Sequence, residues 1–227
     1  MTPPATTTRT PPTATTAPPA RPAPARPSPA RDRLLRAASA LFYAEGLRGV
    51  GVDRVIAQAS VTRATFYRHF PSKEALVVAY LDGVDRTTRE RAGGLPADPA
   101  DAVGAARWLT HLTAQLADQL CAPGFRGCAF INAAAEYPDP TSGVRTAILA
   151  HREWLEVSVT QALSRAGHPD PADACRRWTA LRDGAMVAAY LGDPAAARTT
   201  LIGAVQDLLT RPPGRSAPWW DPGPTGA

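Results

Sequence analysis

Lysine is almost absent from this 227-residue chain: Lys73 is the one lysine among 25 basic side chains, and all the others are arginine. Cysteine is also scarce, because Cys121, Cys128 and Cys175 are odd in number and lack the spacing of metal ligands. These absences argue against a disulfide framework, and they predict a cytoplasmic chain with no metal and no cofactor. No run of 18 apolar residues occurs, so the sequence predicts no membrane span.

Acidic side chains are missing from residues 1–30, which carry three arginines. Residues 31–91 hold 11 basic and 7 acidic side chains, whereas residues 92–227 hold 11 basic and 13 acidic ones. We therefore expect an anionic partner, such as nucleic acid, to meet the N-terminal half of the chain.

Bulky apolar side chains are rare in residues 1–30, which contain ten prolines and eight threonines. Such a segment buries too little surface to offset its chain entropy, so a disordered tail rich in Pro, Thr and Ala is predicted. It is either an extension without a role or a basic arm that touches DNA. Residues 212–227 have a similar composition and form a second predicted tail, although Trp219 and Trp220 could dock onto the folded body.

Between the tails the sequence shows helical patterns and no convincing strand. Capping residues and apolar spacing predict about nine helices, at residues 31–45, 52–58, 62–69, 73–90, 99–120, 128–137, 142–166, 171–191 and 194–210. Three of them open on Asp-Pro pairs, in which Asp98, Asp170 or Asp193 would be the N-cap. The predicted fold is all-α in two parts: a three-helix helix-turn-helix domain at 31–76, with a linking helix to about 90, and a helical domain at 91–211.

The predicted helix 62–69 has two chemically different faces. Phe66 and Phe70 share one face, and the opposite arc carries Ala64, Tyr67 and Arg68. An α-helix enters the major groove of DNA, where arginine can grip guanine and a small apolar group can meet a thymine methyl. This helix therefore has the composition of a recognition helix.

Lys73 lies in the first turn of the next predicted helix. A cation is unfavourable at this end of a helix, where free N–H groups and the helix dipole attract anions. A phosphate would supply the missing negative charge, and the alternative is a lysine that is only solvated.

The run VTRATFYRHFPSKEAL, within residues 52–82, resembles the DNA-binding domain of TetR-type transcriptional regulators. The family pattern is roughly V-S-x-x-T-[LF]-Y-x-[HY]-F-x-[SN]-K-E-x-L. Two positions depart from it: Ser60 stands where the turn usually has glycine, and Gly51 replaces a threonine that commonly caps the second helix. Serine tolerates a positive φ less well than glycine, at a cost of roughly 1 kcal/mol.

The resemblance implies a role for each matching position in a DNA-binding transcriptional regulator that is not an enzyme. Arg63, Ala64 and Arg68 would face bases. Thr65, Tyr67 and His69 would lie by the DNA backbone, with a packed His69 as the alternative. Lys73 would bind a phosphate.

A homodimer on a palindromic operator is expected, because one module of this size makes few phosphate contacts. Two small-residue and apolar stripes in the last two predicted helices have the spacing of a helical bundle. The candidate interface residues are Trp178, Leu181, Ala185, Leu201, Val205 and Leu208, together with Ala174, Ala188, Ala197 and Ala204. The resemblance implies that these helices pair across a two-fold axis, and the alternative is that they pack inside one subunit.

The middle of the chain mixes aromatic side chains with a few polar ones, as binding pockets for small molecules do. The candidate ligand-binding residues are Trp108, His111, Gln115, Phe125, Phe130, Asn132, Tyr137, Trp154 and Met186. Each of them could equally be core. The expected function is a ligand-responsive repressor, with a regulator that binds no ligand, or an activator, as the alternative. An enzyme that uses Glu136 and Asp139 is disfavoured, because no nucleophile motif accompanies them and Pro138 separates them.

Overall fold

A computed structural model describes residues 28–210, and within that range it contains nine helices and no strand. Their bounds are α1 Pro29–Glu45, α2 Val52–Ala59, α3 Arg63–His69, α4 Lys73–Ala92, α5 Ala102–Leu120, α6 Ala129–Glu136, α7 Gly143–Arg165, α8 Pro171–Leu191 and α9 Pro194–Thr210. The predicted all-α fold is confirmed.

The first helix starts earlier than the sequence pattern indicated. Ser28 is the N-cap and its side chain accepts from the Arg31 N–H, while Pro29 occupies the first turn. Residues 28–30, which the sequence pattern placed in the tail, thus belong to the start of α1. The rest of that segment and the C-terminal tail, with Trp219 and Trp220, lie outside the described residues.

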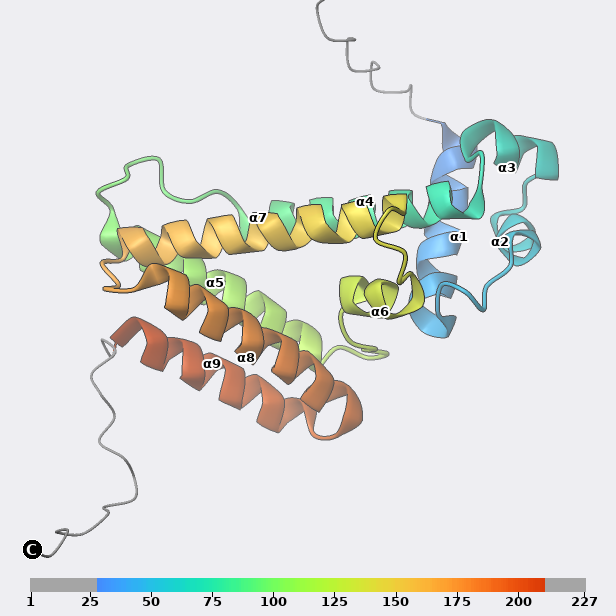
Figure 1. Cartoon of the computed structure of the whole chain (residues 1–227). Coiled ribbons are helices and arrows are strands. Elements are labelled where there is room, and N and C mark those ends of the chain that lie inside the picture. The colour runs from blue at the N-terminus through green and yellow to red at the C-terminus, as the bar shows by residue number, and fades with distance from the viewer. Residues whose placement is uncertain (1–27, 211–227) are drawn as a thin grey trace, which may run out of the picture.

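Helices α1, α2 and α3 gather at one end of the molecule (Figure 1). Leu34 and Phe42 of α1 pack in the same buried core as Phe66 of α3. The turn between α2 and α3 passes through Ser60, whose φ of 51° is the one positive value among the described residues other than glycine. Thr62 then caps α3, because its hydroxyl accepts from the Thr65 N–H at 3.1 Å.

Helix α4 connects this domain to the rest of the chain (Figure 1). It begins at the predicted N-cap, Ser72, whose hydroxyl accepts from the Ala75 N–H at 3.0 Å. Leu76, Val77 and Leu81 are fully buried, and the helix packs against α1 as well as against α5 and α7. One long helix thus carries contacts of both parts.

The second part is a bundle of α5, α7, α8 and α9, with the short α6 beside α7 (Figure 1). Its core is apolar and includes the fully buried side chains Leu109, Leu112, Leu163, Trp178 and Leu201. None of the described helices is long and apolar enough to cross a membrane.

The expected start of α5 at the Asp98-Pro99 pair is wrong. The Asp98 carboxylate accepts from the Ala100 N–H at 2.8 Å and so closes a local turn instead of capping a helix. Asp101 is the N-cap, and it accepts from the Gly104 N–H at 2.7 Å. The other two Asp-Pro pairs start α8 and α9 as predicted, since Asp170 and Asp193 each accept from N–H groups of the first turn.

Candidate DNA interface and effector cavity

The outer face of α3 is polar and exposed to solvent. Arg63, Ala64 and Arg68 are exposed, and Tyr67 keeps 48% of its surface accessible. Phe66, by contrast, is fully buried. The two faces of this helix are therefore divided as the sequence predicted, with small and polar side chains exposed outside and aromatic packing inside.

Arg63 forms an ion pair with Asp53 of α2 on the protein surface. Both side chains are mostly exposed, and such pairs contribute only about 0–1 kcal/mol. The guanidinium can therefore exchange this carboxylate for DNA at small cost.

Thr65 and His69 lie at the margin of the exposed face and are half-buried. The Thr65 hydroxyl lies 2.9 Å from that of Thr62, within the cap of α3. His69 Nε2 is 3.2 Å from the Ser28 hydroxyl at the start of α1. This contact supports the packed role of His69 that the sequence left open.

Lys73 is half-buried, and its Nζ donates to the Arg48 carbonyl at 3.0 Å. Burial lowers its pKa, opposed by the charge of Glu136 and assisted by that of Arg48. The lysine is therefore more than a solvated side chain, because it ties the loop after α1 to the start of α4. Its remaining two N–H donors leave room for a phosphate contact.

A cavity of about 380 Å³ lies between the helix-turn-helix domain and the bundle. Its walls come from α1, α4, α5, α6, α7, α8 and the segment between α5 and α6. The lining residues are Ser39, Tyr43, Tyr80, Val84, Thr88, Arg91, Leu116, Gln119, Ala122, Pro123, Gly124, Phe125, Gly127, Cys128, Ala129, Phe130, His151, Leu155, Arg182 and Met186. This is the size and mixed polarity of a small-molecule site.

Three of the nine predicted pocket residues line this cavity: Phe125, Phe130 and Met186. The other six do not, namely Trp108, His111, Gln115, Asn132, Tyr137 and Trp154. Their polar atoms and rings have other partners. Trp108 Nε1 donates to the Gly93 carbonyl at 3.1 Å, and Trp154 lies under the Arg89 guanidinium at 4.7 Å.

The polar residues of helix α5 and of the segment around α6 also serve local packing. His111 Nε2 lies 2.8 Å from Gln115 Nε2, which also lies 2.9 Å from the Arg91 carbonyl. Asn132 donates to the Arg126 carbonyl at 2.9 Å. Aromatic and polar residues at helical spacing predict an inward face, but they do not tell which inward face has a hollow.

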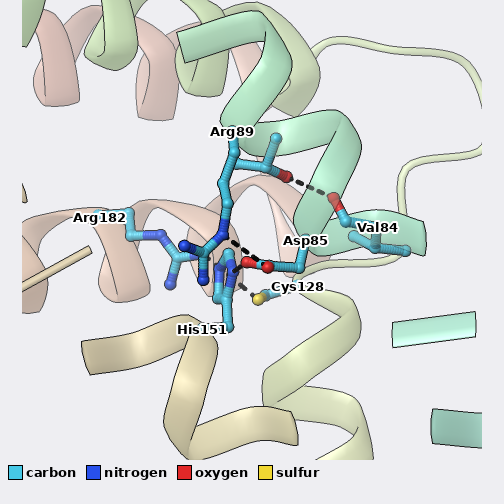
Figure 2. A network of polar contacts seen from close by, with 7 residues as sticks. Val84, Asp85, Arg89, Cys128, His151 and Arg182 are labelled. Carbon is cyan, nitrogen blue, oxygen red and sulfur yellow. Dashed lines mark hydrogen bonds and ion pairs between the residues drawn. The ribbon is translucent and has the colours of Figure 1, made fainter. Parts of the chain in front are cut away.

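A polar network beside the cavity was missed by the sequence reasoning (Figure 2). His151 Nδ1 lies 2.7 Å from an Asp85 oxygen, and the other Asp85 oxygen accepts from Arg89 Nε at 2.6 Å. Arg182 Nη2 lies 3.4 Å from Cys128 Sγ. The sequence did hold one signal, since Arg182 interrupts the otherwise apolar face of α8 that includes Trp178, Met186 and Ala189.

His151 and Arg182 are both buried in this network, with exposed fractions of 2% and 3%. Burial lowers the pKa of His151, and the Arg182 charge adds to this, while the hydrogen bond to Asp85 opposes it. Burial also acts to lower the pKa of Arg182, but Cys128 and Asp183 outweigh it and the net direction is upward. At neutral pH the network therefore holds a neutral imidazole, stacked on Phe130 at 3.7 Å, beside a charged guanidinium.

Glu136 and Asp139, the disfavoured catalytic pair, both act as hydrogen-bond acceptors for the backbone. Glu136 accepts from the Leu47 and Arg48 N–H groups at 2.9 and 2.6 Å. Asp139 accepts from the N–H and hydroxyl of Thr141, which lowers its pKa. The first carboxylate ties α6 to the loop after α1, and the second closes a turn.

Comparison with known proteins decides the family. Residues 34–80 match the sequence model described as "Bacterial regulatory proteins, tetR family". The crystal structure of SCO4454, a TetR-family transcriptional regulator from Streptomyces coelicolor, is 45% identical, with a TM-score of 0.71, over 80% of this chain and 94% of that one. The chain belongs to the TetR family of transcriptional regulators.

Two further relatives are also described as transcriptional regulators. A putative TetR-type regulator from Streptomyces avermitilis is 28% identical over 79% of this chain and 99% of that one, with a TM-score of 0.65. The HTH-type transcriptional regulator LmrA of Bacillus subtilis is 27% identical over 132 residues, which are 56% of this chain and 68% of that protein. As a TetR-family member, this chain is a DNA-binding transcriptional regulator and not an enzyme.

In this TetR-family chain, hydrogen bonds connect the cavity wall to helix α1 of the DNA-binding domain. The Tyr43 hydroxyl of α1 donates to the Gly127 carbonyl at 3.1 Å and accepts from the Arg126 N–H at 2.9 Å. Gly127 lines the cavity, as Tyr43 does. Two hydrogen bonds thus join the segment between α5 and α6, which forms part of the cavity wall, to α1.

Helices α8 and α9 of this regulator form an open groove of about 1140 Å³, lined mainly by small and apolar residues. Leu181, Ala185, Leu201 and Leu208 of the predicted dimer stripe line it, as do Ala174, Ala188, Ala197 and Ala204. Trp178 and Val205 do not.

Trp178 and Val205 belong to the interior of the subunit, which corrects their place in the predicted interface. Trp178 is 1% exposed, and its Nε1 donates to Thr113 at 3.1 Å. Val205 is also buried within the core. Leu201 is equally buried, at 2% exposed, but unlike Trp178 and Val205 it also lines the groove.

Proposed function

We propose that the protein is a homodimeric repressor that binds a palindromic operator through α3 and releases it when a small molecule enters the cavity. The observation that carries this proposal is the hydrogen-bonded connection between the cavity wall and α1 through Tyr43. A ligand that favours one position of the 121–128 segment would favour one position of α1. Repression and release then follow from differential affinity for two arrangements of the same dimer.

The DNA contacts in this proposal come from α3 and the start of α4. Among the described residues Arg68 has no hydrogen-bond, ion-pair or ring partner, and like its neighbour Tyr67 it is exposed. Arg63 exchanges Asp53 for a base edge, and Lys73 adds a phosphate contact beside a helix N-terminus. The residues proposed to contact bases and those proposed to contact phosphates thus lie on two consecutive helices.

The dimer in this proposal forms through the groove between α8 and α9. Small residues such as Gly184 and Ala188 allow two helices to approach closely, and Leu181 and Leu208 supply half-buried apolar surface. Val187, which is 51% exposed, extends the apolar surface. A four-helix interface between two copies would cover this face and set the spacing of the two recognition helices.

A gel shift on DNA taken from beside the protein's own gene tests this function. Specific binding at moderate salt is expected, and Arg68→Ala should weaken preference for that DNA over scrambled sequence. Arg107→Ala on α5 is the matched control, since Arg107 is exposed and distant in the chain from α3. Absence of specific binding by the unmodified protein would refute the proposal.

A further inference from the structure

The cavity is lined by cationic groups without a matching acid. Arg91 and Arg182 line it together with His151, and no carboxylate is among its lining residues, all of which belong to the described part of the chain. A cationic ligand would meet two guanidinium groups and no counterion. The lining therefore favours an anionic occupant over a cationic one.

The carboxylates near the cavity are already shared. Asp183 accepts from Arg182 and also from Arg152, the latter at 3.0 Å. Asp85 is likewise shared between Arg89 and His151. Asp85 balances Arg89 and bonds to the neutral His151, whereas Asp183 is shared by two guanidinium groups, so one positive charge is left in excess at this end of the cavity.

Arg182 is buried with part of its hydrogen-bonding capacity unused. Nη1 donates to Asp183, but Nη2 has only the Cys128 thiol, which is a weak acceptor. Nε is buried and has no hydrogen-bond partner at all. A buried polar group without a partner is unusual in a folded protein and points to an absent acceptor.

The two incompletely used donors lie on one edge of the guanidinium. The Nε–H and one Nη2–H point in parallel, and this planar fork matches the two oxygens of a carboxylate. The rest of the lining is largely apolar, with Leu116, Phe130, Leu155 and Met186 among its members. The cavity would therefore accommodate a ligand that has one anionic end and an apolar body.

Resting on the proposed effector role of this cavity, we propose that its ligand is a small organic carboxylate with an aromatic or aliphatic body, anchored on the Nε–Nη2 edge of Arg182. The carboxylate replaces Cys128 as the acceptor for Nη2 and gives Nε its partner. The volume of about 380 Å³ limits the body to roughly one or two rings or a medium-length chain.

The test uses the full-length protein and four carboxylates: 3-phenylpropionate, indole-3-acetate, 2-naphthoate and decanoate, each paired with its neutral primary amide. Calorimetry measures affinity, and a gel shift measures release of the operator. At least one carboxylate should bind ten-fold or more tightly than its amide. If no acid in the panel binds at least ten-fold more tightly than its amide, the inference is overturned.

Arg182 variants localise the site. Arg182→Lys keeps the charge but loses the fork, and Arg182→Met also loses the charge, so both should lower the affinity at least ten-fold. Arg107→Met is the control and should leave it unchanged. If Arg182→Met unfolds, the folded Arg182→Lys decides, and unchanged affinity in it overturns the inference.

The two proposals fail in different ways. A carboxylate that binds through Arg182 without releasing DNA supports the anion site and refutes the effector role. Release of DNA by one of the neutral amides, with no carboxylate binding, supports the effector role and refutes the anion site.

Discussion

At the scale of single residues, Lys73 shows how one side chain can have both a structural and a proposed functional role. Its Nζ donates to the Arg48 carbonyl, so it orders the loop that precedes α2. The same ammonium lies in the first turn of α4, where an anion is favoured. Arginine would bring a planar fork to a place that needs a compact donor.

Lys73→Ala should weaken binding on specific and unrelated DNA alike, because a phosphate contact carries no sequence information. The slope of log affinity against log salt should become shallower by about one unit. Fluorescence anisotropy between 50 and 200 mM salt measures both effects. Thermal unfolding checks whether loss of the bond to the Arg48 carbonyl has destabilised the protein. An unchanged slope would rule out the phosphate role.

His151 should make stability depend on pH. Its pKa is lowered in the folded protein by burial and by the charges of Arg182 and Arg89, against the opposing effect of Asp85. Between the lowered folded value and the unfolded value of about 6.5, the unfolded chain binds more protons. The free energy of unfolding should therefore fall as the pH falls below about 6.5.

The variant His151→Asn can still donate to Asp85 through its amide and does not titrate. Urea denaturation at pH 7.5 and 5.5 should show a smaller loss of stability on acidification in this variant than in the unmodified protein. Equal losses in both proteins would show that His151 is not responsible.

At the scale of elements, the tight turn between α2 and α3 sets the angle of the recognition helix. Ser60 lies in the left-handed region with a φ of 51°, and its backbone N–H closes the end of α2. Glycine adopts this conformation without the steric cost that a Cβ atom brings.

Ser60→Gly should therefore stabilise the protein by about 0.5–1 kcal/mol, measured by chemical denaturation. The matched control is Ser158→Gly in the middle of α7, where glycine should destabilise by up to about 1 kcal/mol. If Ser60→Gly instead lowered the stability, the left-handed backbone conformation at residue 60 would have no steric cost for serine.

The link between the cavity and α1 is the second feature at this scale. Tyr43→Phe removes the hydroxyl that bonds to Gly127 and Arg126 but keeps the ring. Operator affinity should stay within about threefold, whereas release by a bound ligand should need a higher concentration, because the coupling between the two parts is weakened. An unchanged dose–response curve would show that coupling follows another route.

At the scale of the whole molecule, the proposed function depends on two copies holding their α3 helices at a fixed spacing. The groove between α8 and α9 is the apolar surface proposed for that contact, and Ala188 is an exposed member of its lining. An acidic side chain placed there would be desolvated without a partner in a dimer.

Ala188→Glu should shift the protein to a monomer in sedimentation and lower operator affinity by ~100-fold, since one half-site then binds alone. Val103→Glu is the control, because Val103 is 61% exposed on α5 and does not line the groove. A dimeric Ala188→Glu protein would place the interface elsewhere.

The sequence by itself determined the helices and the character of α3. Most helix bounds follow from local spacing and caps such as Ser72 and Asp170, which act within one turn of chain, although the starts of α1 and α5 did not. The division of α3 into Phe66 inside and Arg68 outside follows from the 3.6-residue period alone. The family resemblance added DNA binding, and the comparisons confirmed the family.

Only the tertiary structure decided which inward-facing residues meet a hollow and which meet each other. Asp85, His151 and Arg182 come from three different helices, and no spacing along the chain joins them. For the same reason Trp178 was placed at a surface although it lies in the core. Periodicity shows that a face is apolar, whereas the packing of neighbouring helices determines whether core, cavity or open groove lies against it.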